Sequence, residues 1–233
     1  MAAHRSRVAT CGPHESVWVN QRPTVIAAAH TLRGNTSGAM VHLRRSEITV
    51  SPPTASEREL LVTSLERQRQ LVLWKVSGLP DGVMRRKMLV SGTSVLGLLK
   101  HLGSVEYGWL CRTFERPTEP LPDIAGDPEA DMRVGDDEIA EELVAFYRRA
   151  IAAADTSIAS LTLDDVGTSW KGTTVSLRWV IVHMIEETCR HLGHLDVMRE
   201  LIDGQIGDTP EFAAHIAADG TRLDTHSGAG NDG

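Results

Sequence analysis

Two candidate metal ligands, Glu187 and His191, lie four residues apart in a stretch of helical character. Side chains at this spacing lie one above the other on the same face of an α-helix. On a helical wheel both fall within the apolar arc that also contains Val180 and Met198. An ionised carboxylate is costly in such surroundings unless it is paired or bound to a metal. The spacing lets a glutamate oxygen and a histidine nitrogen reach one cation, as paired histidines do in metalloprotease helices.

A third candidate ligand, His101, lies between Leu98 and Val105 on the apolar flank of another helical stretch. Taken alone, a glutamate and a histidine four apart are more often a local polar pair, and a single histidine on an apolar flank is more often a packed side chain. The combination favours a metal site. Three protein ligands from two facing helices, with a coordination position left for another molecule, are the arrangement of a catalytic metal centre.

Two further histidines, His183 and His194, flank the same arc of the wheel. Each could be an additional ligand, a hydrogen-bonding neighbour of the ligands or a base that faces a substrate. Cys189 lies on the opposite side of the wheel, which predicts a small packed residue and not a nucleophile. The basic run Arg85–Lys87 is typical of solvated surface, and it could also attract an anionic substrate if its loop overhangs the site. Three tryptophans are expected to pack in the core and at its rim: Trp109, Trp170 and Trp179.

Four stretches show the apolar period of amphipathic helices that could position these residues. The first begins near Ser56 and ends before Gly78, and the second runs from the cap-rich residues 91–94 to Trp109. The third runs from about residue 136 to 160, and the fourth from about 174–176 to Gly204, a residue that suits a helix end. No stretch shows a convincing strand period. The pattern predicts an all-α fold, an antiparallel four-helix bundle.

The rest of the chain differs in composition from these helical stretches. Residues 1–54 lack a sustained period and end at a Ser-Pro-Pro-Thr boundary, so we expect an irregular or disordered extension there. The bundle is expected to occupy residues 55–205. Residues 206–233 are predicted to be mostly a disordered tail, because they are too polar to offset their ordering entropy.

Charge and composition exclude several classes of protein. The 233 residues carry a formal net charge of −7, whereas a dedicated nucleic-acid binder needs clustered positive charge. No apolar run reaches the roughly 18–20 residues of a membrane span, and the first residues lack the apolar core of a secretory signal. The three cysteines form no CxxC pair. We therefore expect a cytoplasmic protein without nucleic-acid or membrane partners, and leave open whether it is a monomer or a homodimer.

Two stretches of the sequence resemble the DinB superfamily. The second predicted helix contributes Ser94–Leu102, followed by Glu106 and Trp109. The fourth contributes a longer series: Ser176–Trp179, His183–Glu187, Arg190–His194, Arg199–Glu200 and Asp203–Gly204. The resemblance covers about residues 55 to 205 and is strongest to the actinobacterial branch related to mycothiol-dependent enzymes.

The resemblance implies a DinB-like four-helix bundle with a divalent metal in its core, usually held by three histidines. This sequence departs from that pattern, because it has Glu187 where the common motif has the first histidine of His-x-x-x-His. The mycothiol-dependent maleylpyruvate isomerases are similar in using one glutamate and two histidines for zinc. The resemblance therefore implies His101, Glu187 and His191 as ligands, and the added negative charge should make the metal a weaker Lewis acid.

The same resemblance implies a thiol S-transferase or isomerase that activates a low-molecular-weight thiol for attack on an electrophilic small molecule. Mycothiol is the thiol that the resemblance favours. Zinc is the expected metal, and nickel, iron and manganese also suit this donor set. His183, His194 or Arg190 would hydrogen-bond the ligands or hold the cofactor. Two alternatives stay open: a metal-dependent hydrolase on the same site, and a non-enzymatic stress or binding protein whose metal only staples the bundle.

Overall fold

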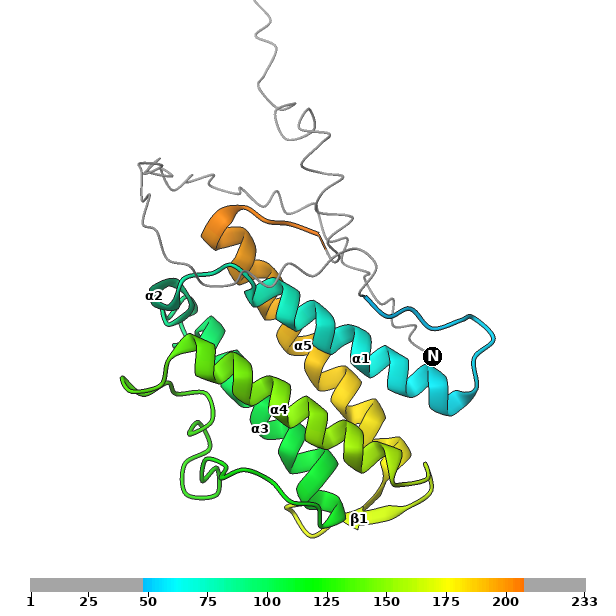
Figure 1. Cartoon of the computed structure of the whole chain (residues 1–233). Coiled ribbons are helices and arrows are strands. Elements are labelled where there is room, and N and C mark those ends of the chain that lie inside the picture. The colour runs from blue at the N-terminus through cyan, green and yellow to red at the C-terminus, as the bar shows by residue number, and fades with distance from the viewer. Residues whose placement is uncertain (1–47, 208–233) are drawn as a thin grey trace, which may run out of the picture. The chain divides into compact units, whose positions relative to one another are not determined.

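The computed structural model describes residues 48–207, which form a bundle of helices (Figure 1). The long helices of this region are α1 (Glu57–Val76), α3 (Val95–Glu106), α4 (Ala140–Ala159) and α5 (Leu177–Asp203). A short helix, α2 (Asp81–Met84), lies between α1 and α3. α3 continues through a π-helical turn (Tyr107–Cys111) and a 3₁₀ turn (Arg112–Phe114). The predicted all-α fold is confirmed.

Local side-chain chemistry sets the helix ends. Ser56, Ser94 and Ser176 each precede a helix, and each side-chain oxygen accepts a hydrogen bond from the backbone N–H three residues later. Such caps satisfy backbone donors that have no partner within the helix. α5 ends at Gly204, which takes a left-handed φ of 75° that a residue with a Cβ adopts at a cost. α4 begins at Ala140, slightly later than predicted.

The four long helices form two pairs. Within each pair the helices are parallel, and the two pairs run in opposite directions. In the first pair, Arg178 at the start of α5 contacts Glu57 at the start of α1, and Asp196 late in α5 contacts Lys75 late in α1. α1 and α5 are therefore parallel, and they lie side by side in Figure 1. α3 and α4 form the second pair, and they are parallel because Lys100 contacts Glu138, just before α4, and Tyr107 contacts Phe146, further along both.

The parallel course of α3 and α4 explains the long connection 115–139. This segment must return along the bundle before α4 can start, and the ion pair of Lys100 Nζ with Glu138 Oε1 at 2.8 Å marks its return. The segment passes close to α3 at Gly97, where a Cβ would overlap the carbonyl oxygen of Met132. Glycine is therefore required for this close approach.

A two-stranded hairpin joins α4 to α5, and the sequence pattern did not predict it. β1 (Val166–Thr168) pairs antiparallel with β2 (Thr174–Ser176). Strands of three residues are too short to show an alternating period. The hairpin packs on the end of the α3 extension, where a Cβ at Gly167 would overlap the carbonyl oxygen of Thr113.

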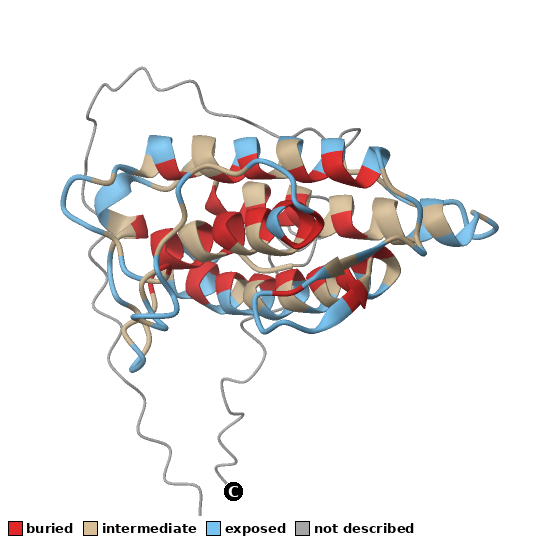
Figure 2. Ribbon diagram, turned by 90° about the horizontal axis from the view of Figure 1, so that it is seen from below, coloured by how far each residue is buried: buried red, intermediate tan, exposed pale blue. Residues whose placement is uncertain are grey.

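The buried residues face the interior of the bundle, as the red segments of Figure 2 show. One cluster contains Leu98 and Leu102 of α3 with Leu195 of α5, and a second contains Leu65 of α1 with Met184 of α5. α5 therefore contributes buried residues to both clusters.

A buried ion pair crosses this core. The guanidinium of Arg69 donates to both carboxylate oxygens of Glu106 at 2.7 and 2.6 Å, and both side chains are only 1% exposed. Arg69 also donates to Asp155 at 2.8 Å, so one side chain joins α1, α3 and α4. These hydrogen bonds offset the cost of removing the charges from water.

The extension predicted for residues 1–54 and the tail predicted for 206–233 fall mainly outside the described residues. Thr49, which is described, donates its backbone N–H to Gln70 Oε1 on α1 at 2.7 Å. Within residues 48–207, no helix combines the length and the apolar character that a membrane crossing requires.

We expect Glu106→Gln to destabilise the fold by about 3–5 kcal/mol, because it leaves the buried Arg69 without its charged partner. The free energy of unfolding from urea titration measures the loss. Glu57→Gln, which removes a half-exposed carboxylate paired with Arg178, is the matched control and should cost far less. Equally small losses of unfolding free energy in both variants would contradict the stabilising role of the buried Arg69–Glu106 pair.

Candidate metal centre

The structure brings together the three residues that the sequence singled out. His101 of α3 and Glu187 and His191 of α5 each offer one donor atom, and these atoms all lie within 4.8 Å of one another. His101 Nε2 lies 3.2 Å and His191 Nε2 lies 3.1 Å from the same oxygen, Glu187 Oε1. All three side chains are partly buried. Their assignment as metal ligands stays a prediction.

The helices place these donors by ordinary amphipathic packing. Leu98 and Leu102 on α3 are buried, and His101 lies at the edge of the face they form. On α5, Met184 and Leu195 are buried and bracket the turn that carries Glu187 and His191. The donors therefore lie where the apolar seam between α3 and α5 meets solvent.

A carboxylate that the sequence did not single out completes the cluster. Asp131, only 4% exposed, lies with Oδ2 2.7 Å from His101 Nδ1. It comes from the connection 115–139, where no periodic pattern marks a residue as inward-facing. A carboxylate on the far nitrogen of a metal-binding histidine fixes the ring and its tautomer.

The hydrogen bonds at His101 test whether this donor set suits a cation. When Nδ1–H donates to Asp131, the neutral ring presents a lone pair at Nε2 toward the Glu187 oxygen. Two electron-rich atoms at this distance attract each other only through a proton or a cation between them. His191 Nδ1 is buried without a hydrogen-bond partner among the described residues. Two imidazoles and one carboxylate are also an ordinary donor set for zinc.

The same contacts shift the pKa values of two of these side chains. Burial disfavours the charged form of His101, but hydrogen bonds with Asp131 and Glu187 outweigh it and raise the pKa of His101 to about 9. Hydrogen bonds with His101 and His191 hold the pKa of Glu187 far below its ordinary value. Glu187 is therefore ionised at neutral pH, the form that binds a cation.

The other histidines occupy different surroundings. The His194 ring lies 5.6 Å from the His191 ring, next to the cluster and exposed. His183 instead stacks on Trp179, away from the three donors. Arg190 is exposed on α5. His183 is therefore not among the grouped donors, although it is only four residues from Glu187.

Neither described cysteine fits the role of a nucleophile. Burial raises the pKa of Cys111 to about 11, and it also raises the pKa of Cys189. Cys189 is exposed, so the prediction that it packs was wrong. Position on the wheel alone misleads here because the face of α5 opposite Glu187 is open to solvent. Among residues 48–207, therefore, no cysteine offers a reactive thiol.

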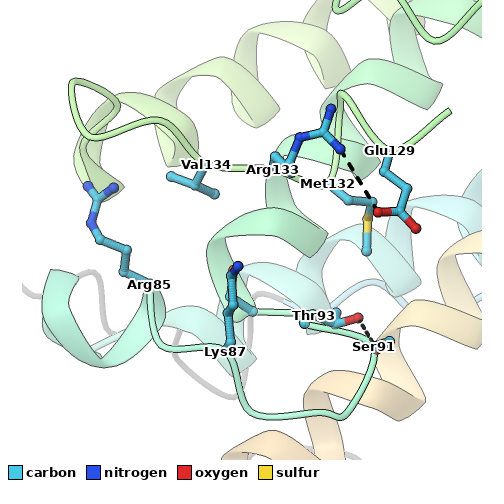
Figure 3. A pocket seen from close by; sticks show the side chains of 10 residues that line it. Arg85, Lys87, Ser91, Thr93, Glu129, Met132, Arg133 and Val134 are labelled. Carbon is cyan, nitrogen blue, oxygen red and sulfur yellow. Dashed lines mark hydrogen bonds and ion pairs between the residues drawn. The ribbon is translucent and has the colours of Figure 1, made fainter. Parts of the chain in front are cut away.

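The basic run contributes to a cavity of about 280 Å³, shown in Figure 3. Arg85 and Lys87 line it together with Arg133. The guanidinium of Arg85 is held by Asp81, and that of Arg133 by Asp127, so much of the positive charge is already neutralised. We expected a solvated basic surface here. Arg85 departs from it in part, because its side chain is partly buried and its charge is paired with Asp81.

A comparison with known protein families gives a match over most of the described region. A family model described as mycothiol-S-transferase matches residues 60–204, which include most of α1 and all of α3, α4 and α5. A comparison with curated proteins finds none that matches the chain.

If Asp131 orients His101 toward a metal, Asp131→Asn should weaken zinc binding by about 10- to 100-fold while the three donors remain. Competition with a chromophoric chelator at fixed pH measures the affinity. Glu129→Gln is the matched control, because Glu129 is an exposed carboxylate of the same segment. Unchanged zinc affinity in Asp131→Asn would remove Asp131 from the site.

Proposed function

Because the chain belongs to the mycothiol-S-transferase family, we propose that it is a divalent-metal-dependent enzyme that transfers the thiol mycothiol to an electrophilic small molecule. The observation that carries the metal dependence is the convergence of His101 Nε2, His191 Nε2 and Glu187 Oε1. Zinc is the proposed metal. Nickel, iron and manganese bind similar donor sets, so the availability of each metal in the cell would decide which one is bound.

His101, Glu187 and His191 would hold the cation. A cation bound there would lower the pKa of a coordinated thiol, so that the reactive thiolate forms near neutral pH. With a proton on His101 Nδ1 donated to Asp131, Nε2 would be left to bind the cation. Glu187 contributes a negative charge that three histidines would lack, which tempers the electrophilicity of the centre.

His194 is the residue that we assign to accept the proton lost by the thiol. Its ring lies 5.6 Å from the ring of His191, and it is exposed, so it can pass the proton to water. In S-transfer the thiol sulfur forms a bond to the electrophilic carbon, and the leaving group departs with the bonding electrons. The raised pKa values of Cys111 and Cys189 support a thiol that is brought by the cofactor.

The neighbouring glutamates of α5 provide a matched test. Glu187→Gln should lower both the zinc content and the rate of mycothiol transfer by more than about 100-fold, and His101→Ala should do the same. Glu186→Gln should leave both unchanged, because Glu186 is exposed and outside the donor cluster. Elemental analysis and an electrophile panel with and without mycothiol are the measurements.

Three results would contradict the proposal. Stoichiometric zinc in His101→Ala would overturn the ligand assignment. Turnover of esters or amides without thiol would favour a hydrolase that uses metal-bound hydroxide. No turnover with any electrophile, together with a large fall in melting temperature on chelation, would indicate a metal that only staples the bundle.

A further inference from the structure

A second site lies further along the seam between α3 and α5. It is a pocket of about 600 Å³ between the end of α3, the β1–β2 hairpin and the start of α5. Three tryptophans line it: Trp109, Trp170 and Trp179. The chain has only five tryptophans, and the side chains of Trp170 and Trp179 are 61% and 48% exposed. The sequence predicted that these tryptophans pack in the core and at its rim. That prediction does not account for the exposure of the Trp170 side chain.

Two of the three tryptophan rings, those of Trp109 and Trp179, are held in a defined arrangement around His183. Its ring is stacked on Trp179, with centroids 5.1 Å apart and planes within 10°. Trp109 meets the same imidazole edge-on at 4.6 Å and the Trp179 ring at 5.6 Å. Mutual packing thus fixes these side chains before any ligand binds, which lowers the entropy cost of binding.

The pocket has little charge of its own. No carboxylate is among its lining residues in the described part of the chain, and its one cation, Lys171, lies over the Trp170 ring at 4.7 Å. Residues with hydroxyl groups also line the pocket, among them Thr173 and Thr174. Indole faces carry partial negative charge and attract polarised C–H groups, while hydroxyls exchange hydrogen bonds. This combination suits an uncharged, hydroxyl-rich ring, such as a sugar or a cyclitol.

The pocket is close enough to the donor cluster to share one ligand with it. His183 precedes Glu187 by four residues of the same helix, roughly 6 Å along the axis. On the facing helix, Trp109 follows His101 by eight residues, and α3 and α5 run in opposite directions. Pocket and donors are therefore neighbours on one seam.

Mycothiol joins an N-acetylcysteine through an amide bond to the glucosamine nitrogen of glucosaminyl-inositol, so its two hydroxyl-rich rings carry no charge. We infer that Trp170, Trp179 and Trp109 bind this saccharide part, leaving the cysteine arm to extend along the seam toward His101 and Glu187. The inference rests on the proposed function, since it names the subsite for the thiol of that reaction. Trp170 and Trp179 are then residues that determine which thiol is used.

Calorimetry of the full-length, zinc-loaded protein with N-acetylglucosaminyl-inositol, which has no thiol and keeps the uncharged amide of mycothiol, tests the pocket apart from the reaction. The wild type should bind it, and Trp170→Ala and Trp179→Ala should each weaken binding by about tenfold or more, since each removes an aromatic surface from the ligand. Trp179→Phe should recover part of the affinity. Leu201→Ala, an exposed apolar residue outside the pocket, is the control and should bind normally.

Kinetics give a second readout. In the tryptophan variants the KM for mycothiol should rise by about tenfold or more, whereas the KM for N-acetylcysteine, which has the same thiol without the rings, should not change. Wild-type protein that does not bind the saccharide, or a variant that raises the KM for the electrophile and leaves that for mycothiol unchanged, would overturn the inference.

The two proposals fail in different ways. His101→Ala should lose transfer and still bind the saccharide, which supports a pocket that is independent of the donors. Saccharide binding that depends on Trp179, in a protein without transferase activity, would support the pocket and refute the proposed function. Transfer from mycothiol by a protein that does not bind the saccharide would support the proposed function and refute the pocket.

Discussion

The opposed packing of α3 against α5 is the constraint on which both sites depend. Because the two helices run in opposite directions, His101 in the middle of α3 faces Glu187, and Trp109 at its end faces His183 near the start of α5. A shift of one residue in α5 would turn each side chain by about 100° and remove Glu187 from the seam. The buried leucines and methionines that fix this register are therefore as necessary to the chemistry as the donors are.

The direction of α4 has a consequence of its own. α4 is parallel to α3, so residues 115–139 return along the bundle, and this return brings Asp131 to His101. Gly97 allows the segment to approach closely enough. A bundle with simple alternating helices would have joined α3 to α4 by a short loop and left His101 Nδ1 facing solvent. The long connection is thus part of the site, although it contains no long helix or strand.

Features with a helical period could be predicted from the sequence. The four long helices, the caps at Ser56, Ser94 and Ser176, and the convergence of His101, Glu187 and His191 all follow from positions on a 3.6-residue helix. Contacts between segments without a period could not be. The pair Arg69–Glu106, the Asp131 contact and the hairpin that carries Trp170 each depend on how distant segments meet.

The glutamate at position 187 has a physical advantage over a third histidine. Its Oε1 lies within hydrogen-bonding distance of two imidazole nitrogens, and their contacts hold the carboxyl group ionised. Three neutral imidazoles at the same place would each need a hydrogen-bond donor for the unprotonated nitrogen. None of them would offer an acceptor with a full negative charge. Before a cation binds, protons on the two Nε2 atoms would let both rings donate to this carboxylate, and Asp131 fixes His101 from the other side. The weaker Lewis acidity that follows from the extra negative charge is the cost of this preorganisation, and a thiol, which ionises far more readily than water, tolerates it.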